Sequence, residues 1–135
     1  MKKAAIFLAV ISLLFTFTGC ESPQAEEESG TVQYKKITAA QAYADIAADS
    51  SIIILDVRTD EEFAELRIPG SILIPDYETK DTVEQILPDK SAKIYIYCRS
   101  GRRSALAAKE MIALGYTDVA DFGGIIDWPY ETVSG

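Results

Sequence analysis

The sequence predicts an α/β fold with a mostly parallel central sheet and helices on both of its faces. Two nearly uncharged, β-prone runs, at residues 51–57 and 93–97, indicate strands that are buried on both sides. Helical segments alternate with these strands, which is typical of β-α-β units. The 135 residues suffice for one such domain and leave little room for a second.

Capping signals mark where the first two helices begin. Thr38 precedes the helix expected at 39–48, because a threonine hydroxyl accepts a hydrogen bond from a free N–H group of the first turn. Thr59 precedes a shorter helix at 60–66, and Glu62 lies three residues later, as a capping box requires. We expect the buried face of the first helix to consist of Ala42, Ile46 and Ala47.

The later elements follow the same alternation. The best helix spans 104–114 and ends at Gly115, and a smaller helix at 81–87 ends at Pro88. A final helical turn begins at Asp127. Ligands of such folds bind beyond the carboxyl ends of the strands. Short strands are expected at 34–37, 72–74 and 119–120.

The composition excludes several kinds of site. The chain has no histidine, so it cannot contain a Ser-His-Asp triad, a Cys-His dyad or an imidazole metal ligand. Two cysteines are too few for a structural zinc site, and we expect neither a metal nor a cofactor. The net charge of −8 argues against nucleic acid as a partner.

Residues 1–19 have the features of a signal peptide. Two lysines precede an uncharged run that is short for a membrane-spanning helix, which needs about 20 apolar residues. Residues 17–20, Phe-Thr-Gly-Cys, resemble the lipobox of bacterial lipoproteins, although Phe17 replaces the usual leucine. The resemblance implies an exported protein with a lipid on Cys20 that anchors it to the extracytoplasmic side of a bacterial membrane. A plain secretory signal is the alternative.

Residues 20–33 are expected to form an acidic, flexible tether, and residues 34–135 the folded domain. The tether segment contains four glutamates, a proline and small polar residues, which cannot build a core. If Cys20 carries a lipid on its sulfur, Cys98 is the one free thiol of the chain. The alternative is a Cys20–Cys98 disulfide.

Cys98 follows the strand at 93–97 directly and precedes the best helix. Arg99, Arg102 and Arg103 lie within five residues of it, and cations and helix N-termini favour a thiolate. Gly101 allows the loop to turn backbone N–H groups inward as an anion nest. These features favour a reactive thiol over the buried, inert thiol that a free cysteine often is.

The length of this loop separates two chemistries. Cysteine-dependent phosphatases carry an arginine six residues after the cysteine, where this chain has Ser104. The loop is therefore better suited to a sulfur atom carried on Cys98 than to a phosphate group.

Across residues 34–131 the chain resembles a single-domain rhodanese, a thiosulfate sulfurtransferase. The rhodanese motifs occur in the family's order and spacing, and Leu66-Arg67 replaces the Gly-His that many relatives have. We expect this replacement to alter local structure and partner contacts and to leave the thiol chemistry intact. The matching segments are Cys98–Ser104 (C-x-x-G-x-R-S), Asp56–Arg58 with Glu62–Phe63, Ile68–Ser71, Gly115–Tyr116 and Gly123–Trp128.

The resemblance implies that Cys98 takes a sulfur atom from thiosulfate or a similar small anion, holds it as a persulfide and passes it to cyanide or a thiol. Backbone N–H groups of residues 99–103 would stabilise the negative charge. Arg99 and Arg102 would attract the donor. The substrate-binding residues are then Arg99, Ser100, Gly101, Arg102 and Arg103.

Four further residues are expected to support the pocket: Asp56, Arg58, Ser104 and Trp128. We expect Arg58 to pair with Glu62 and Ser104 to cap the following helix. Arg103 has two interpretations, substrate binding or pairing with a carboxylate. Trp128 also has two, the pocket mouth or the core.

Three functions remain open from the sequence. They are a lipid-anchored sulfurtransferase, an anion or redox enzyme of the arsenate reductase or phosphatase type, and a non-catalytic binding module. The expected partners are a small anionic sulfur donor, a thiol or cyanide acceptor, and a bilayer contacted through Cys20. We expect a monomer.

Overall fold

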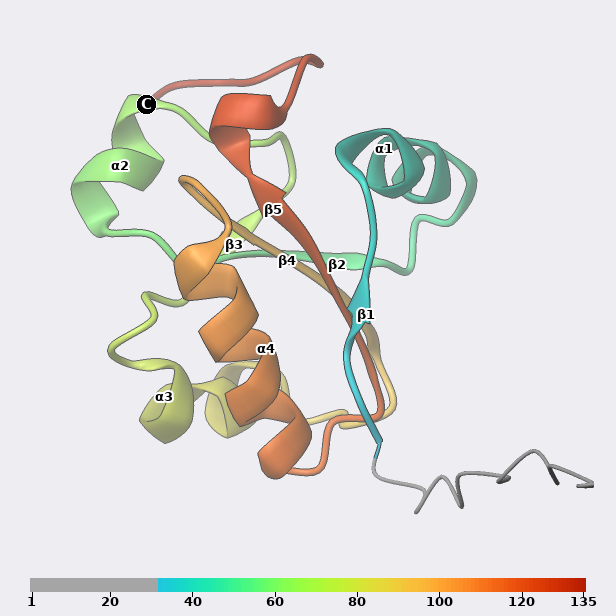
Figure 1. Cartoon of the computed structure of the whole chain (residues 1–135). Coiled ribbons are helices and arrows are strands. Elements are labelled where there is room, and N and C mark those ends of the chain that lie inside the picture. The colour runs from blue at the N-terminus through green and yellow to red at the C-terminus, as the bar shows by residue number, and fades with distance from the viewer. Residues whose placement is uncertain (1–31) are drawn as a thin grey trace, which may run out of the picture.

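A five-stranded sheet with the strand order β1-β5-β4-β2-β3 forms the centre of the molecule (Figure 1). The computed structural model describes residues 32–135, so the signal peptide expected at 1–19, Cys20 and most of the expected tether lie outside the described residues. Within the described part, all four strand pairings are parallel, which confirms the predicted α/β sheet. The strands are β1 (Lys35–Lys36), β2 (Ile53–Asp56), β3 (Ile72–Leu73), β4 (Lys93–Cys98) and β5 (Asp118–Gly124).

Strand β4 separates two hydrophobic cores. Ile94, Ile96 and Cys98 pack on one face of the sheet, and Tyr95 and Tyr97 pack on the other. Successive side chains of a strand point to opposite faces, so a strand covered on both sides has no polar face. Helices α3 (Thr79–Ile86) and α4 (Arg102–Ala113) cover the first core, and α1 (Ala39–Ala48) covers the second. The prediction of helices on both faces is confirmed.

The predicted N-caps of α1 and α2 (Asp60–Glu65) are present. The Thr38 hydroxyl accepts from the third residue of its helix over 3.1 Å. Thr59 and Glu62 exchange both bonds of a capping box, at 3.0 and 3.3 Å.

The sequence prediction for the buried face of α1 was wrong at one residue. Ala42 is fully buried and Ile46 is packed against the core, whereas Ala47 is exposed. Five residues correspond to about 140° of helical rotation, which carries Ala47 away from the face of Ala42.

Several element boundaries differ from the sequence prediction. Helix α3 begins at Thr79 instead of 81, and α4 begins at Arg102 instead of 104. Strand β5 continues to Gly124, because Gly124 still pairs with Cys98 of β4. The last helical turn, η1, spans Ile125–Asp127 and so begins earlier than expected.

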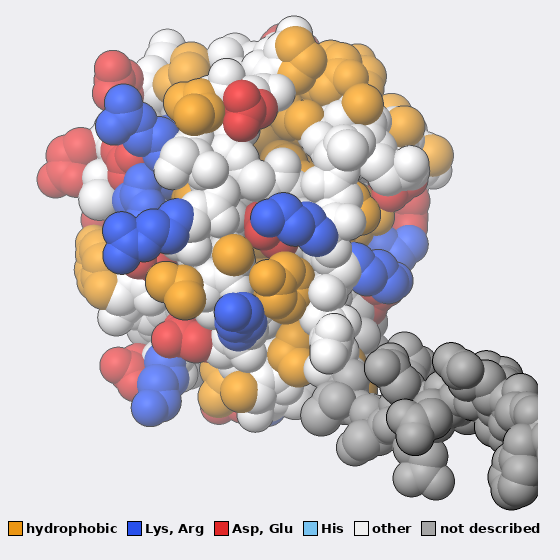
Figure 2. All heavy atoms as spheres, in the orientation of Figure 1, with side chains coloured by type: hydrophobic (Ala, Val, Ile, Leu, Met, Phe, Trp, Pro, Cys, Tyr) orange, Lys and Arg blue, Asp and Glu red, His pale blue; other side chains and the backbone are white. Residues whose placement is uncertain are grey.

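The carboxyl ends of the strands meet at one edge of the sheet, beside α2 and η1 (Figure 1). Figure 2 shows acidic, basic and apolar side chains interspersed over the face that it draws, without a continuous basic surface. Among residues 32–135, every helix is too short or too polar to span a bilayer.

Candidate active site

Cys98 is the last residue of β4, and its sulfur lies at the beginning of α4. The Gly101 N–H donates a hydrogen bond to Sγ over 3.0 Å, and the Ser104 hydroxyl oxygen lies 3.5 Å from Sγ. Within residues 32–135 Cys98 is a free thiol, and the alternative Cys20–Cys98 disulfide involves a cysteine outside the described residues. Only 1% of Cys98 is exposed. The sulfur is therefore recessed within the core, but polar groups contact it on the side of the loop.

Gly101 makes the loop between β4 and α4 tight. Its φ of +98° is left-handed, a conformation that glycine adopts without steric cost. A Cβ at this position would lie 3.3 Å from the Gly123 Cα. Because α4 begins at Arg102, the N–H groups of residues 102–104 have no acceptor within the helix. The beginning of α4 thus offers free donors and the positive end of a helix dipole, which together favour an anion.

The prediction that Ser104 caps α4 was wrong. Gly101 is the N-cap residue, and Ser104 is the third residue of the helix and fully buried. The Ser104 hydroxyl lies 3.2 Å from the Gly101 carbonyl and 3.4 Å from the Gly123 carbonyl, as well as beside the sulfur. A hydroxyl donates one hydrogen bond at a time. Its proton can therefore serve a carbonyl or a negatively charged Sγ.

Strand β5 packs directly against the loop. Ile96 pairs with Asp121 whereas Cys98 pairs with Gly124, so β5 contains one extra residue, as in a β-bulge. A Cβ at Gly124 would lie 2.2 Å from the Arg99 carbonyl oxygen, far inside van der Waals contact. The rhodanese-like segment Gly123–Trp128 begins with two glycines. The structure shows why the second, Gly124, has no room for a side chain.

The predicted Arg58–Glu62 ion pair was wrong. Arg58 pairs with Asp56, with Nη2 and Oδ2 2.7 Å apart and both side chains buried. The same Nη2 donates to the Leu66 carbonyl over 2.5 Å. Burial is the largest single influence and opposes the charge of Arg58, but the hydrogen bonds and the charge of Asp56, together with Tyr97, raise its pKa. Asp56 and Arg58 are only two residues apart, and their ion pair is buried. The pair holds the Arg58 guanidinium against the Leu66 carbonyl.

Glu62 pairs with Arg103 instead. The two hydrogen bonds are 2.7 and 2.8 Å long and join α2 to the first turn of α4. The bonds from Arg103 are the main reason why the pKa of Glu62 falls to about 2. The same contact raises the pKa of Arg103. Of the two interpretations of Arg103, the structure confirms pairing with a carboxylate.

The Glu62–Arg103 pair predicts an acid-dependent stability. Glu62 has a pKa of about 2 in the folded protein against an ordinary value of 4.5, so the pair stabilises the fold above pH 4.5. Its contribution is lost as the pH falls from 4.5 towards 2. We expect Glu62→Gln, which keeps the Thr59 capping bond, to lower the Tm at pH 7, and the difference from wild type to vanish near pH 2.

Thermal unfolding followed by circular dichroism between pH 2 and 7 measures this difference. Glu65→Gln is the matched control, because Glu65 is exposed on the same helix and has no ion-pair partner among residues 32–135. A Tm difference for Glu62→Gln that stayed constant across this range would contradict the proposed coupling.

A cavity of about 370 Å³ opens beside the loop. Its cations are Arg58, which is paired with Asp56, and Arg99, which has no carboxylate within 4 Å among residues 32–135. Cys98 does not line this cavity. No three carboxylate or thiol side chains of the described region gather closely enough to hold a metal ion. The lining consists of Arg58, Glu62, Glu65, Leu66, Arg99, Ile125 and Ile126.

The other predicted site residues are divided between the surface and the core. Ser100 and Arg102 flank Gly101 along the chain and are exposed. Trp128 is not at the cavity: it packs in the second core, 5.5 Å from the Phe122 ring and 5.0 Å from the Tyr130 ring. Its Nε1–H donates to a backbone carbonyl three residues later over 3.2 Å. Of the two interpretations of Trp128, the structure confirms the core position.

Sequence reasoning missed the role of Tyr97. The Tyr97 hydroxyl accepts from the Ile68 N–H over 3.1 Å and lies 3.2 Å from the Ser71 hydroxyl. Burial is the main cause of its raised pKa. Tyr97 thereby fixes the Ile68–Ser71 turn. The combination of an Ile-Pro-Gly turn and a tyrosine at a strand's carboxyl end could have indicated this contact.

Arg67 occupies a position where many rhodaneses have histidine. Its backbone pairs with Val133 through two bonds of 2.8 Å. Its guanidinium lies 4.8 Å from the centre of the Phe63 ring and donates to the Phe63 carbonyl over 3.3 Å. In this structure Arg67 therefore closes the end of α2 and anchors the C-terminal segment.

Comparison with known proteins identifies the family. Residues 38–129 match the family described as the Rhodanese-like domain. The chain belongs to this family. The rhodanese from Escherichia coli solved with anions is a structural relative with a TM-score of 0.59 and 33% identity. The alignment covers 62% of this chain and 99% of that structure.

Named sulfurtransferases are among the relatives. The thiosulfate sulfurtransferase PspE of Escherichia coli is 35% identical over 81 residues, which are 60% of this chain and 78% of PspE. The adenylyltransferase and sulfurtransferase UBA4 of Candida albicans is 35% identical over 133 residues. That match covers 80% of this chain and 30% of UBA4, so the chain spans under a third of that larger protein.

Proposed function

We propose that this rhodanese-like protein is a sulfurtransferase that carries a sulfane sulfur as a persulfide on Cys98. The observation that carries the proposal is the position of Cys98 Sγ at the beginning of α4, 3.0 Å from the Gly101 N–H. Such a position stabilises a sulfur anion without a neighbouring base. The chain has no histidine that could supply one. The similarity to PspE supports thiosulfate as the donor.

In the first half-reaction the Cys98 thiolate attacks the outer sulfur of thiosulfate. A sulfur–sulfur bond to Cys98 forms while the bond between the two sulfurs of thiosulfate breaks, and sulfite leaves with that electron pair. The terminal sulfur of the persulfide then carries the negative charge. The Gly101 N–H and the free N–H groups of the first turn of α4 stabilise this charge.

In the second half-reaction a nucleophilic acceptor attacks the terminal sulfur of the persulfide. A thiolate acceptor forms a new persulfide and cyanide forms thiocyanate; in both cases the Cys98 thiolate leaves with the electron pair. The Ser104 hydroxyl lies 3.5 Å from Sγ and can turn its proton towards the sulfur as this charge returns.

The donor approaches through the cavity that Arg99 lines. Arg99 is exposed and has no carboxylate partner among residues 32–135, so it can attract an anion. Since only 1% of Cys98 is exposed, the loop at 99–101 has to open before a donor sulfur reaches Sγ.

Phosphate chemistry has less support. Position 104, where a cysteine-dependent phosphatase has arginine, is a buried serine in α4. Arg103 next to it is engaged by Glu62. No guanidinium of the loop is therefore free at that position to bind a phosphate group.

We further propose an exported, monomeric protein anchored to a bacterial membrane through a lipid on Cys20. The support is the order of the N-terminal sequence: two lysines, an uncharged run, the lipobox-like residues 17–20 and the acidic segment at 20–33. A single acyl chain binds a membrane only marginally, so stable anchoring needs more than one chain.

Intact mass spectrometry of the protein purified from bacterial membranes tests both proposals. After exposure to thiosulfate we expect a mass increase of one sulfur atom, which added cyanide removes. We also expect loss of residues 1–19 and the mass of acyl chains on Cys20. If a sample whose Cys98 thiol is unmodified gained no sulfur atom, the persulfide would be rejected. The same holds if Cys98→Ser still gained one. An unlipidated protein would reject the anchor alone.

A further inference from the structure

A second cavity lies between the edge strand β1 and helix α4. Its volume is about 470 Å³, which is within the range of organic-ligand sites, about 300–1,000 Å³. None of its lining residues belongs to the catalytic loop or to the cavity beside it. We call it the β1–α4 groove; it is lined by Val32, Gln33, Tyr34, Lys36, Lys109 and Ile112.

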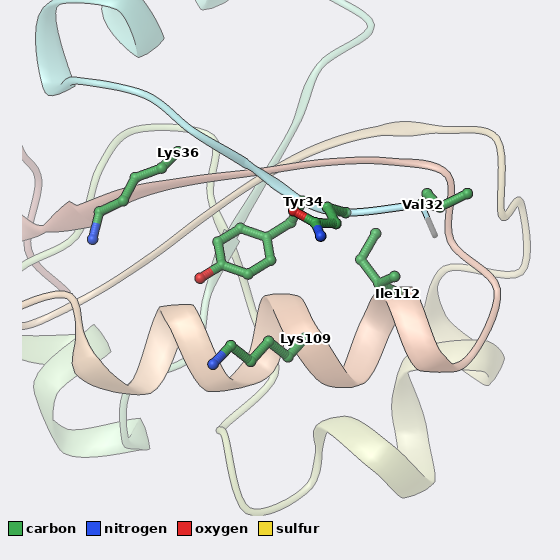
Figure 3. Close-up of a pocket in the computed structure, with 6 residues that line it drawn as sticks. Val32, Tyr34, Lys36, Lys109 and Ile112 are labelled. Atoms are coloured by element: carbon green, nitrogen blue, oxygen red, sulfur yellow. The ribbon is translucent and has the colours of Figure 1, made fainter. Parts of the chain in front are cut away.

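The groove has a polar end and an apolar end. Figure 3 shows the ammonium groups of Lys36 and Lys109 and the hydroxyl of Tyr34 towards one end. Val32 and Ile112 lie at the other end. A ligand that fills the groove therefore meets hydrogen-bond donors at one end and hydrocarbon at the other.

Both lysines of the groove are unpaired within residues 32–135. Elsewhere Lys35 pairs with Asp118 and Lys93 with Asp49, at 3.1 and 2.9 Å. No carboxylate of the described residues lies within 4 Å of either groove lysine. Asp121 is the register partner of Lys36 on β5, but it is fully buried and makes no ion pair with it. In a chain of net charge −8, two ammonium groups that line one groove without an ion-pair partner among residues 32–135 favour an anionic ligand.

We propose that the β1–α4 groove binds a soluble organic anion that has a single acidic head group and an apolar tail. The head group lies between the ammonium groups of Lys36 and Lys109 and accepts a hydrogen bond from the Tyr34 hydroxyl. The tail lies along Ile112 and Val32. An inorganic anion would leave the apolar end in water, and an uncharged chain would leave the two lysines without a partner. The proposal does not depend on the sulfurtransferase function.

Titration of the isotopically labelled full-length chain with octanoate, followed by amide NMR shifts, tests the proposal. We expect saturable shifts at residues 32–36 and 109–112. Octanol, which lacks the charge, and acetate, which lacks the tail, should bind about tenfold more weakly or not at all. Absence of saturable binding, equal binding of all three probes, or shifts centred on residues 98–104 would each overturn the proposal.

Substitutions in the groove provide the second arm of the test. The double variant Lys36→Gln/Lys109→Gln should bind octanoate about tenfold more weakly. Lys80→Gln is the matched control, because Lys80 is exposed on α3 and does not line the groove. Cys98→Ser should bind octanoate like wild type. Equal loss in the Lys80 control would reject a specific site.

Vesicles of phosphatidylglycerol distinguish a soluble ligand from a membrane surface. We expect the double variant to lose binding of monomeric octanoate and to bind vesicles as the wild type does. If the double variant instead lost vesicle binding and kept octanoate binding, the groove would be a membrane contact and the proposal would be wrong.

Discussion

Cys98→Ser and Cys98→Ala are expected to lower sulfur transfer from thiosulfate to cyanide by about a thousandfold or more. Serine retains a hydrogen-bond acceptor near the Gly101 N–H, but its hydroxyl is a weak nucleophile and cannot form a persulfide. Alanine removes the nucleophile altogether. The rate of thiocyanate formation at saturating thiosulfate measures the loss. Undiminished transfer in either variant would reject Cys98 as the sulfur carrier.

Two measurements keep this result interpretable. Both variants should retain the circular dichroism spectrum of the wild type. Cys98 is buried, and each replacement is smaller than the thiol, so it fits without overpacking. In the wild type, iodoacetamide should alkylate Cys98 slowly, since 1% of the residue is exposed, and thiosulfate should slow the reaction further. A thiol that stayed unreactive after prolonged incubation would contradict the opening of the loop at 99–101.

Gly124→Ala is expected to have the second largest effect. The new Cβ would lie 2.2 Å from the Arg99 carbonyl oxygen and 2.6 Å from the Ser100 Cα, and both are backbone atoms that cannot turn away. The loop has to move, so we expect about a hundredfold lower activity, because small displacements at a reacting centre cost that much. Overpacking of this kind should also lower the free energy of unfolding by about 1–3 kcal/mol.

Gly123→Ala is the matched control. Gly123 has a φ of +93°, which strains alanine, but a Cβ there would meet no atom within 4 Å. We expect it to lose stability by about 1–2 kcal/mol and to keep most of its activity. Steady-state assays and urea unfolding of both variants separate strain from loop displacement. Equal activity losses at 123 and 124 would contradict the steric argument.

The short-range features of this fold could be predicted from the sequence. Thr38 and Thr59 cap their helices as expected, because a cap involves residues three apart and depends little on the rest of the chain. The buried strands β2 and β4 were also recognisable, since a strand covered on both faces excludes charge from most of its length. The position of Cys98 at the end of β4 follows from that strand.

The partners of charged groups could not be predicted. Arg58 lies near both Asp56 and Glu62 in the sequence, and the pair with Glu62 was the one expected. Only the fold brings Arg103, 41 residues away, to Glu62 and leaves Arg58 to Asp56. Ion pairing depends on where two chain segments meet in space, which local spacing does not determine.

By itself, the sequence determined the alternation of strands and helices, the place of a cysteine at a strand's carboxyl end and the chemistry that arginines and a glycine beside it permit. The tertiary structure decided that Gly101 rather than Ser104 begins α4 and that β5 supports the loop through Gly124. It also decided how deeply Cys98 is buried. The reason is that hydrophobic pattern and capping are properties of neighbouring residues, whereas close backbone approach and burial arise where distant segments pack together.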